Sequence, residues 1–482
     1  MRHPRFFTLA CFALTLLAGG AARTAFAQLT TLVQTGDPAN RVDIVFLGDG
    51  YTQADHDAGL FDDHVGSYLD YLFGGGSAAG GLADPFPRYQ NFFNVHQVEV
   101  VSNESGADKP PEGVFRDTAL DAKYYANDIE RLLTVSTSKA NAALGDALAG
   151  TGVTADMRYT TVNDAKYGGS GGSWATFAGA NPQAHEIALH EVGHAFADLA
   201  DEYVSHDDPF PFGEPSEVNV TIDPTGQKWE RWLGFDDPRG SDLDIGVYEG
   251  ARYYATDVYR PSRDSKMRSL DEPYDAVSRE AIIEAIYAQV DPIDDHLSNL
   301  TPLLDPETLW VEVIDPTVIA VDWYVDDTIV EGAQGSEFDP QHWGLAAGEH
   351  TVRALAYDNA LDHAFAGGVL DLIRLDPAGF QQQIEWTVSL TATAVPGDYN
   401  GDGTVGVEDY AAWVDTYGST NQLAADGNAN GVVDAADFTV WRDHYHGATA
   451  SAVSAAVPEP AALGLLASLC GAVLPRAHRQ RG

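Results

Sequence analysis

The chain has 482 residues, with 27 lysines and arginines against 72 aspartates and glutamates and a formal net charge of −45. Such a charge repels phosphate backbones and anionic lipid surfaces, which excludes nucleic acid as an expected partner. The apolar fraction of 44% is too high for a disordered chain, and domains of roughly 100–200 residues predict about two to four of them.

Both ends of the chain indicate export and sorting. Residues 1–27 place two arginines before an apolar run and finish in Ala25-Phe26-Ala27, the order of a secretory signal peptide cleaved before Gln28. Residues 457–482 contain Pro458-Glu459-Pro460, an apolar run and an arginine-rich tail. This tail resembles the PEP-CTERM sorting signal. The resemblance implies an exported protein, extracellular or attached to the cell envelope, with envelope sorting machinery as a partner.

The only cysteines, Cys11 and Cys470, lie in these two removable ends. The mature protein is therefore expected to have no disulfide, although export usually permits them. Bound metal is a candidate for the stabilisation that disulfides would otherwise provide.

Residues 28–295 alternate strand and helix patterns, which is typical of an α/β domain with a mixed sheet. The expected strands are 41–47, 92–101 and 157–162, and the expected helical segments are 54–73, 118–149 (one or two helices), 183–198 and 277–290. A glycine-rich loop at 168–172 follows the third strand.

Residues 300–394 change in character and contain short alternating runs at 309–314, 318–325, 350–357 and 384–392. These runs indicate a small β-sandwich with an immunoglobulin-like pattern. Residues 396–447 contain an internal repeat offset by 28 residues. The protein is thus predicted to be multidomain, with an α/β domain, a β-sandwich and a small α-helical module.

The expected helix at 183–198 carries an HExxH motif, His190-Glu191-Val192-Gly193-His194. Positions i and i+4 lie on one face of a helix, so His190 and His194 can hold one zinc ion through neutral imidazole nitrogens. Glu191 can then serve as general base, taking a proton from the metal-bound water and passing it to the leaving amine. A chance match, or a helix with two surface histidines, is the alternative.

A catalytic zinc needs a third protein ligand, and three carboxylates follow the motif. If the chain turns back near Asp198, then Asp201, seven residues after His194, can reach the metal. Glu202 is its rival, and Asp198 becomes a candidate if the helix continues. Asp201 is favoured, and the three alternatives stay open at this point.

Met267 is an independent signal, because a turn that carries methionine beneath the zinc is the second signature of metzincin peptidases. It lies downstream of the HExxH motif and shortly before the expected helix at 277–290. A methionine that fills a gap in the core is the alternative interpretation.

Taken together, these blocks resemble the M64 metallopeptidases, the family named for an IgA peptidase. The resemblance covers about residues 40–290 and rests on the segments 47–52, 102–106, 166–171, 190–203, 248–251 and 259–261. It implies a zinc-dependent endopeptidase of metzincin type that acts on a protein or peptide. It does not identify IgA as the substrate.

In such an architecture, the edge strand nearest the zinc can pair with an extended substrate. We expect the strand at 157–162 and the loop at 168–172 to take this part, because glycines let a peptide backbone pass close to the site. A flexible surface loop without that role is the equally weighted alternative.

The repeat at 396–447 holds a second metal pattern. Each copy has oxygen side chains at loop positions 1, 3, 5 and 12, glycine at 6 and a backbone carbonyl at 7, as in an EF-hand-like calcium loop that ends in aspartate. The expected ligands are Asp398, Asn400, Asp402, Thr404 and Asp409 in the first copy and Asp426, Asn428, Asn430, Val432 and Asp437 in the second. This pattern predicts about two structural calcium ions.

The repeat pair resembles a dockerin type I module. The resemblance implies calcium-dependent folding and a cohesin-like docking partner. A calcium-stabilised spacer without a partner is the equally weighted alternative.

The patterns favour a secreted zinc endopeptidase that hydrolyses peptide bonds through a zinc-bound water, with Glu191 as the base. Tyr203, Tyr248 and Arg268 are candidates for stabilising the oxyanion. The alternative is a non-enzymatic, calcium-dependent scaffold or adhesion protein of the envelope. Glu191 discriminates between the two, because a structural zinc has no use for a base beside an open position.

Overall fold

The computed structural model describes residues 28–74, 81–361, 372–391 and 395–445. The chain divides into two compact units, Met1–Thr391 (unit 1) and Ala392–Gly482 (unit 2). The expected signal peptide and sorting tail lie outside the described residues. Within the described ranges, no helix has both the length and the apolar character needed to cross a bilayer.

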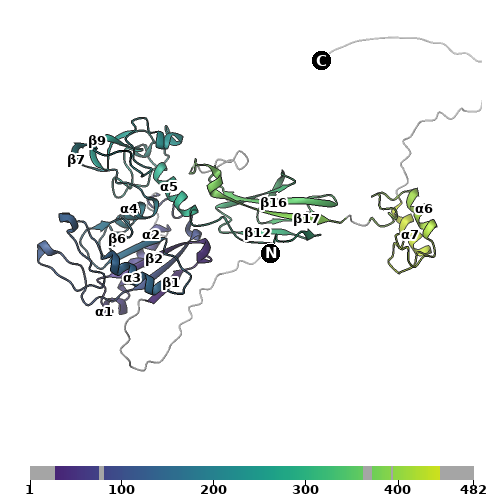
Figure 1. Cartoon of the computed structure of the whole chain (residues 1–482), viewed down its shortest axis with the longest axis horizontal. Helices are drawn as coiled ribbons and strands as arrows, with labels where there is room; N and C mark the ends of the chain where they lie inside the picture. The colour runs from purple at the N-terminus through teal and green to yellow at the C-terminus, as the bar shows by residue number, and fades with distance from the viewer. Residues whose placement is uncertain (1–27, 75–80, 362–371, 392–394, 446–482) are drawn as a thin grey trace, which may run out of the picture. The chain divides into compact units, whose positions relative to one another are not determined.

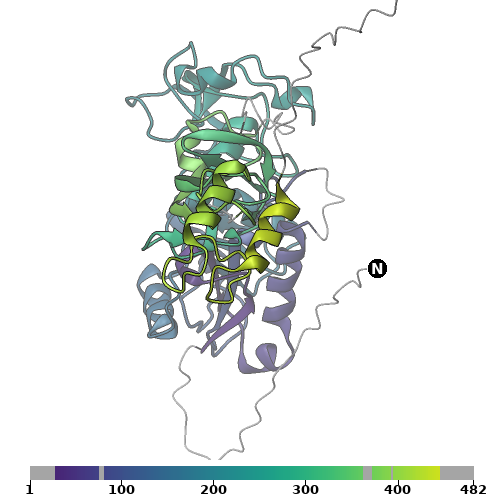
Figure 2. The same ribbon diagram turned by 90° about the vertical axis from the view of Figure 1, so that its right-hand side faces the viewer.

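A six-stranded mixed sheet forms the centre of the first part of unit 1 (Figure 1 and Figure 2). Its order is β1-β3-β2-β4-β6-β5, with a parallel centre and an antiparallel strand at each edge. The strands are β1 (Gln28–Val33), β2 (Val42–Asp49), β3 (Phe93–Glu99), β4 (Met157–Val162), β5 (Gly169–Ser170) and β6 (Ala175–Ala178). This arrangement confirms the expected mixed α/β class.

Helices cover both faces of this sheet. Alternate residues of β2 show the two sides: Ile44 and Phe46 pack with the core that contains α2 and α4, whereas Val45 and Leu47 pack with α3. The helices are α1 (Gln53–Asp57), α2 (Leu60–Leu72), α3 (Thr137–Leu148), α4 (Ala184–Ala197) and α5 (Ala276–Tyr287).

Two of the expected helical segments differ in the structure. The first is split into α1 and α2, because Gly59 takes a left-handed conformation with φ of 76°. The second survives only as α3, and the chain before it forms loops anchored on the buried carboxylate of Asp49. That carboxylate accepts backbone N–H groups from Leu120 at 3.0 Å and Ala122 at 2.9 Å. A long-range contact therefore overrides the local helical pattern.

A smaller sheet of order β7-β9-β8 follows α4, which the sequence patterns do not predict. Its strands are β7 (Val204–Pro209), β8 (Tyr248–Ala251) and β9 (Tyr253–Arg260). Short 3₁₀ turns occur at Pro38–Asn40, Gln90–Phe92, Pro110–Glu112, Ala126–Asp128, Gln227–Trp232, Ser241–Leu243 and Pro377–Phe380.

In its described residues, the expected sandwich segment forms two sheets, of order β11-β17-β16-β13-β14 and β10-β12-β15. Trp323 of β13 stacks on Phe338 of β15 with ring centroids 5.2 Å apart, which joins the two sheets. The immunoglobulin-like assignment stays a prediction. The strands are β10 (Ile293–His296), β11 (Leu303–Leu304), β12 (Leu309–Val313), β13 (Ile319–Val325), β14 (Thr328–Gln334), β15 (Glu337–Phe338), β16 (Gly348–Asp358) and β17 (Gln381–Leu390).

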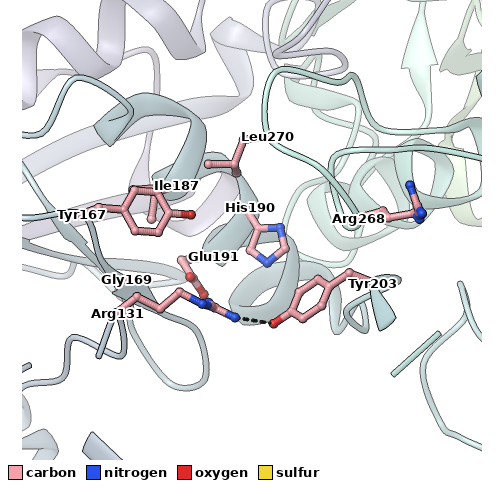
Figure 3. Close-up of a pocket in the computed structure, with 9 residues that line it drawn as sticks. All are labelled: Arg131, Tyr167, Gly169, Ile187, His190, Glu191, Tyr203, Arg268 and Leu270. Atoms are coloured by element: carbon pink, nitrogen blue, oxygen red, sulfur yellow. Dashed lines mark hydrogen bonds between the residues drawn. The ribbon is translucent and has the colours of Figure 1, made fainter. Parts of the chain in front are cut away.

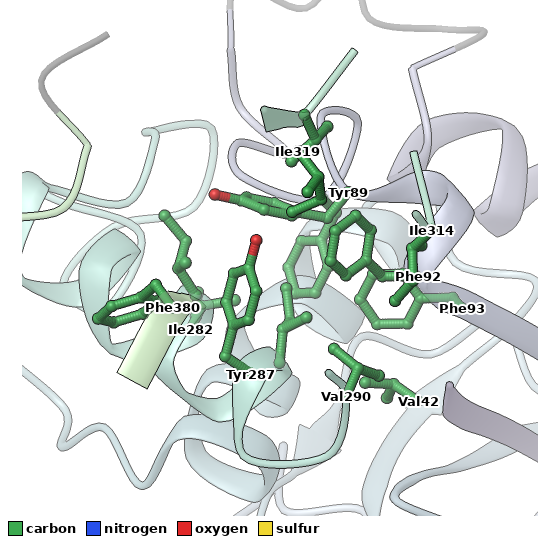
Figure 4. Packing of buried hydrophobic residues seen from close by; sticks show 14 of the residues in the cluster. Val42, Tyr89, Phe92, Phe93, Ile282, Tyr287, Val290, Ile314, Ile319 and Phe380 are labelled. Atoms are coloured by element: carbon green, nitrogen blue, oxygen red, sulfur yellow. The ribbon is translucent and has the colours of Figure 1, made fainter. Parts of the chain in front are cut away.

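The α/β segment and the sandwich share one hydrophobic core. Figure 4 shows Tyr89 and Phe92 of the α/β segment, Tyr287 of α5, and Ile319 and Phe380 of the sandwich in a single cluster. The two segments that the sequence separates near 295–300 are therefore continuous in their packing.

Asp358, at the end of β16, adds polar contacts to this junction. Its buried carboxylate accepts hydrogen bonds from Tyr89 Oη at 2.7 Å and Tyr287 Oη at 2.8 Å, and it pairs with Arg88 at 2.7 Å. Replacing Asp358 by alanine should lower the free energy of unfolding by about 3–5 kcal/mol, because two buried hydroxyls lose their acceptor and Arg88 keeps only neutral partners such as Asn359.

Urea unfolding would measure this loss. The control is Glu385→Ala, which removes an exposed carboxylate of β17 and should change the free energy of unfolding by less than about 0.5 kcal/mol. Equal losses in the two variants would contradict the role given to Asp358.

The described part of unit 2, residues 395–445, contains two helices, α6 (Val407–Thr416) and α7 (Ala435–His444), and each follows one loop of the repeat. Each helix donates a hydrogen bond to the opposite loop. Trp413 Nε1 donates to the carbonyl of Asp434 at 2.9 Å, and Trp441 Nε1 donates to the carbonyl of Gly406 at 2.7 Å. Both acceptors occupy position 9 of their loops, so the two copies hold each other through equivalent atoms.

Candidate active site

Helix α4 presents the two histidines of the HExxH motif. Ile187, Leu189 and Val192 are buried in the core, so packing sets the orientation of the helix. His190 and His194, one turn apart, line a cleft with their ring centroids 4.9 Å apart and their planes at 86°.

Asp198 ends the helix and turns the chain back towards the histidines. It has left-handed backbone angles (φ 49°, ψ 41°), and its N–H donates to the carbonyl of Gly193. Aspartate tolerates this conformation better than most residues. The Asp198 residue is exposed, whereas the turn brings Asp201 to the imidazoles.

Asp201 completes a triangle of donor atoms. Its Oδ1 lies 3.0 Å from His190 Nε2 and 3.3 Å from His194 Nε2, and the two nitrogens are 3.2 Å apart. Bonds of about 2.0–2.1 Å to a tetrahedral zinc place ligand atoms roughly 3.3 Å from one another. The three donors therefore fit one zinc ion. A carboxylate oxygen of Glu191 lies within 4.8 Å of a ring nitrogen of each histidine.

Backbone carbonyls fix the tautomers of both imidazoles. His190 Nδ1 lies 2.9 Å from the carbonyl oxygen of Lys266, and His194 Nδ1 lies 2.5 Å from that of Leu199. Because a carbonyl only accepts hydrogen bonds, each Nδ1 carries the hydrogen and each Nε2 keeps its lone pair for a metal.

Glu191 lies against the glycine-rich loop. A Cβ on Gly171 would come within 3.0 Å of Glu191 Oε2, and a Cβ on Gly169 would come within 3.1 Å of Glu191 Oε1. Both glycines thus let the loop enclose the carboxylate. Burial raises the pKa of Glu191 against the opposing effect of His190 and His194, a direction that would favour proton uptake by this carboxylate.

A family comparison supports a peptidase at this site. Residues 30–241 match the family model IgA Peptidase M64. The match supports the M64 family, and its range contains His190, Glu191, His194 and Asp201. No curated protein matches the chain.

The comparison with solved structures adds no argument. It finds the endo-beta-1,4-mannanase from Thermotoga petrophila at 13% sequence identity and a TM-score of 0.13, covering 52% of this chain and 50% of that chain. This chain therefore spans half the length of the mannanase. A likeness at this score carries nothing about fold or function.

Met267 lies beyond the range matched to the M64 model and follows Lys266, whose carbonyl contacts His190. It is fully buried, and a Cβ on Gly193 of α4 would come 2.7 Å from its Sδ. The neighbouring Lys266 is also buried and forms an ion pair with Glu186, at the other end of α4. The turn around Met267 is thus attached to α4 through Lys266 and through Gly193, while the role of Met267 as a Met-turn stays a prediction.

Gly193→Ala should destabilise the protein by about 1–3 kcal/mol, because the added methyl group would overlap Met267 Sδ. Helix propensity acts in the opposite direction and favours alanine by about 1 kcal/mol. Gly145→Ala in α3 is the matched control, since a Cβ there meets no atom within 4 Å. Thermal unfolding should show Gly145→Ala stabilising and Gly193→Ala destabilising, and the same sign for both would contradict the packing argument.

Glu202, the rival ligand, is held away from the metal donors. Its buried carboxylate accepts hydrogen bonds from Asn219 Nδ2 at 2.9 Å and from Ser265 Oγ at 2.7 Å. Its N–H donates to the carbonyl of Met267 at 2.8 Å. Glu202 therefore connects the segment after α4 to the turn that contains Ser265 and Met267. Asp201 is the carboxylate that the structure brings to the histidines.

Tyr253 is a site residue that the sequence patterns miss. Its hydroxyl donates to Asp201 Oδ2, and its N–H donates to the carbonyl of Tyr203 at 2.9 Å. Its φ of 75° is rare for tyrosine. No local signal marks this contact, because it spans 52 residues and depends on the turn between β8 and β9.

Two adjoining cavities open beside the metal donors. The main cleft has a volume of about 610 Å³ and runs past both histidines, Asp201 and the loop at 169–172. A side cavity of about 250 Å³ shares His190 and Glu191 with it; its lining residues are those labelled in Figure 3.

Two of the three oxyanion candidates lie at these cavities. Tyr203 lines both, and Arg268 lines the side cavity. Tyr248 lines neither cavity, and its hydroxyl donates to the carbonyl of Asp244 at 3.3 Å.

The expectation that the strand at 157–162 forms the substrate-pairing edge is wrong. This strand, β4, lies between β2 and β6, so both of its edges are occupied. The edge strand is β5, within the glycine-rich loop, and Leu132 already bridges to Gly169 there. The loop packs on Glu191 and His194 and so forms a wall of the site itself.

In unit 2, carboxylates of each repeat loop accept hydrogen bonds from backbone N–H groups of the same loop. Asp398 accepts the backbone N–H groups of residues 401–403, and Asp426 accepts those of residues 430 and 431. Asp409 and Asp437, at position 12 of the two loops, are fully buried. Carboxylate, amide and carbonyl oxygens are the donors that calcium prefers, although calcium binding stays a prediction.

Proposed function

We propose that this protein is an exported, zinc-dependent endopeptidase that hydrolyses peptide bonds in proteins. The observation that carries the proposal is the donor triangle of His190, His194 and Asp201 with Glu191 beside it. The M64 match over this region supports the peptidase activity.

The chemistry divides between the metal and the side chains around it. When bound, zinc supplies Lewis-acid polarisation of the scissile carbonyl and lowers the pKa of water. Glu191 accepts a proton from the attacking water and returns it to the leaving amine. Arg131 donates to Tyr203 Oη at 3.0 Å, so the Tyr203 hydroxyl is free to donate its own hydrogen to the developing oxyanion.

Zinc content tests the proposal. The purified chain should hold about one tightly bound zinc ion and cleave a casein-like substrate. His190→Ala should lose both zinc and cleavage, whereas His185→Ala, a histidine of the same helix outside the donor triangle, should keep both. Cleavage by the His190→Ala variant at the rate of the parent would overturn the proposal and favour the non-enzymatic scaffold.

We further propose that unit 2 holds two structural calcium ions, one in each loop. Export through residues 1–27 and sorting through residues 457–482 complete the proposal. The expected result for the exported protein is an N-terminus at Gln28, read by mass spectrometry. A pull-down with the calcium-loaded chain tests a cohesin-like partner against a spacer without one.

A further inference from the structure

We propose that the side cavity binds an acidic side chain of the substrate residue next to the scissile bond. The inference rests on the proposed peptidase function and adds the chemical class of the substrate. Because the cavity shares His190 and Glu191 with the main cleft, a group seated in it belongs to a residue beside the reacting bond (Figure 3).

Two arginines, Arg131 and Arg268, line this small cavity, although acidic residues outnumber basic ones 72 to 27 in the chain. Arg131 donates to Tyr203 Oη at 3.0 Å, and its guanidinium lies 5.7 Å from the centre of that ring. Asp201 and Glu191 interact with Arg131 electrostatically, but no ion pair found within the described ranges includes Arg131. The tyrosine thus orients a cation without neutralising it.

Arg268 is also only weakly compensated. Its contact with Asp264 is long, at 3.5 Å, and both side chains are partly exposed. Its Nε is buried and has no hydrogen-bond partner. A guanidinium has five N–H donors, so Arg268 keeps donors for a ligand. Figure 3 shows Arg131 and Arg268 on different sides of His190.

The rest of the lining fits an acidic side chain. Ile187 and Leu270 give the cavity apolar walls on which the methylene groups of a glutamate can pack. Glu191 is the one carboxylate in the lining, where it stands against two arginines. The residues that line the cavity therefore carry a net positive charge, although the protein as a whole is acidic.

Cleavage-site mapping tests the inference on the zinc-loaded full chain. Digestion of a diverse denatured protein mixture, read by mass spectrometry, should enrich aspartate and glutamate at one position beside the cut. A peptide with glutamate at that position should be cleaved about 10- to 100-fold faster, by kcat/KM, than its glutamine counterpart. Amidation of the peptide's C-terminus should leave this ratio unchanged, since the recognised carboxylate belongs to a side chain.

The variant Arg268→Gln should remove most of the preference for glutamate over glutamine, mainly through KM, and Arg131→Gln should reduce the same ratio. This ratio would not move if the arginines were merely structural. Arg353→Gln, in the sandwich, is the control and should leave it unchanged. Cleavage without an acidic preference, or a ratio unchanged in both variants, overturns the inference alone. A zinc-loaded chain that cleaves nothing overturns the proposed function as well.

Discussion

Glu191→Gln should bind as much zinc as the parent and cleave peptide bonds about 10²- to 10⁴-fold more slowly, because the amide cannot accept the proton of the attacking water. The substitution preserves the size of the side chain. This matters because the backbones of Gly169 and Gly171 approach its two oxygens so closely that a Cβ would lie 3.0–3.1 Å away.

Two measurements on the same sample separate the loss of catalysis from the loss of zinc. Elemental analysis reports zinc per chain, and initial rates on a casein-like substrate report cleavage. Glu284→Gln, on the exposed side of α5, is the matched control and should leave both values unchanged. A Glu191→Gln variant that cleaves as fast as the parent would contradict the proposed peptidase function. The calcium-dependent scaffold would then be the better hypothesis.

Removal of calcium with a chelator should unfold unit 2 of the full chain and leave unit 1 folded. Asp398, Asp402 and Asp409 belong to one loop, and Asp409 is fully buried, so without the ion their negative charges have no counter-charge. A calcium concentration 100 times the dissociation constant adds about 2.7 kcal/mol to the stability of a unit with one site. For a unit this small, that added stability determines whether it stays folded.

Limited proteolysis with mass mapping would locate the change. Cuts should appear within residues 395–445 on chelation and disappear when calcium is restored. Asp409→Asn should mimic chelation, whereas Asp415→Asn, an exposed residue of α6 outside the loop, should behave like the parent. Equal proteolysis of unit 2 with and without calcium would contradict the calcium assignment.

The positions of the helix that carries the HExxH motif and of a central strand of the sheet are predicted well by the local sequence pattern. The expected helix at 183–198 is α4, Ala184–Ala197, and the expected strand at 157–162 coincides with β4. Their signals are local, because a helix face and a buried strand each have a period that the sequence displays. The spacing of His190 and His194 follows from the same helical period.

The identity of the third candidate metal ligand cannot be predicted from the local sequence pattern. Asp201 and Glu202 are adjacent, and the choice between them follows from the left-handed turn at Asp198 and from Asn219, which bonds to both the N–H and the carbonyl of Ala200. The loops before α3 are unpredictable for a similar reason, since a single carboxylate on a distant strand organises them.

The junction at Asp358 bears on how this protein can be divided. Residues 28–295 resemble a self-contained catalytic module in sequence, and the M64 match ends even earlier, at residue 241. A recombinant fragment cut near 295–300 would nevertheless leave Tyr89, Phe92 and Tyr287 without the apolar side chains that cover them. We expect such a fragment to aggregate on expression, so the sandwich belongs to the smallest fragment that should stay in solution.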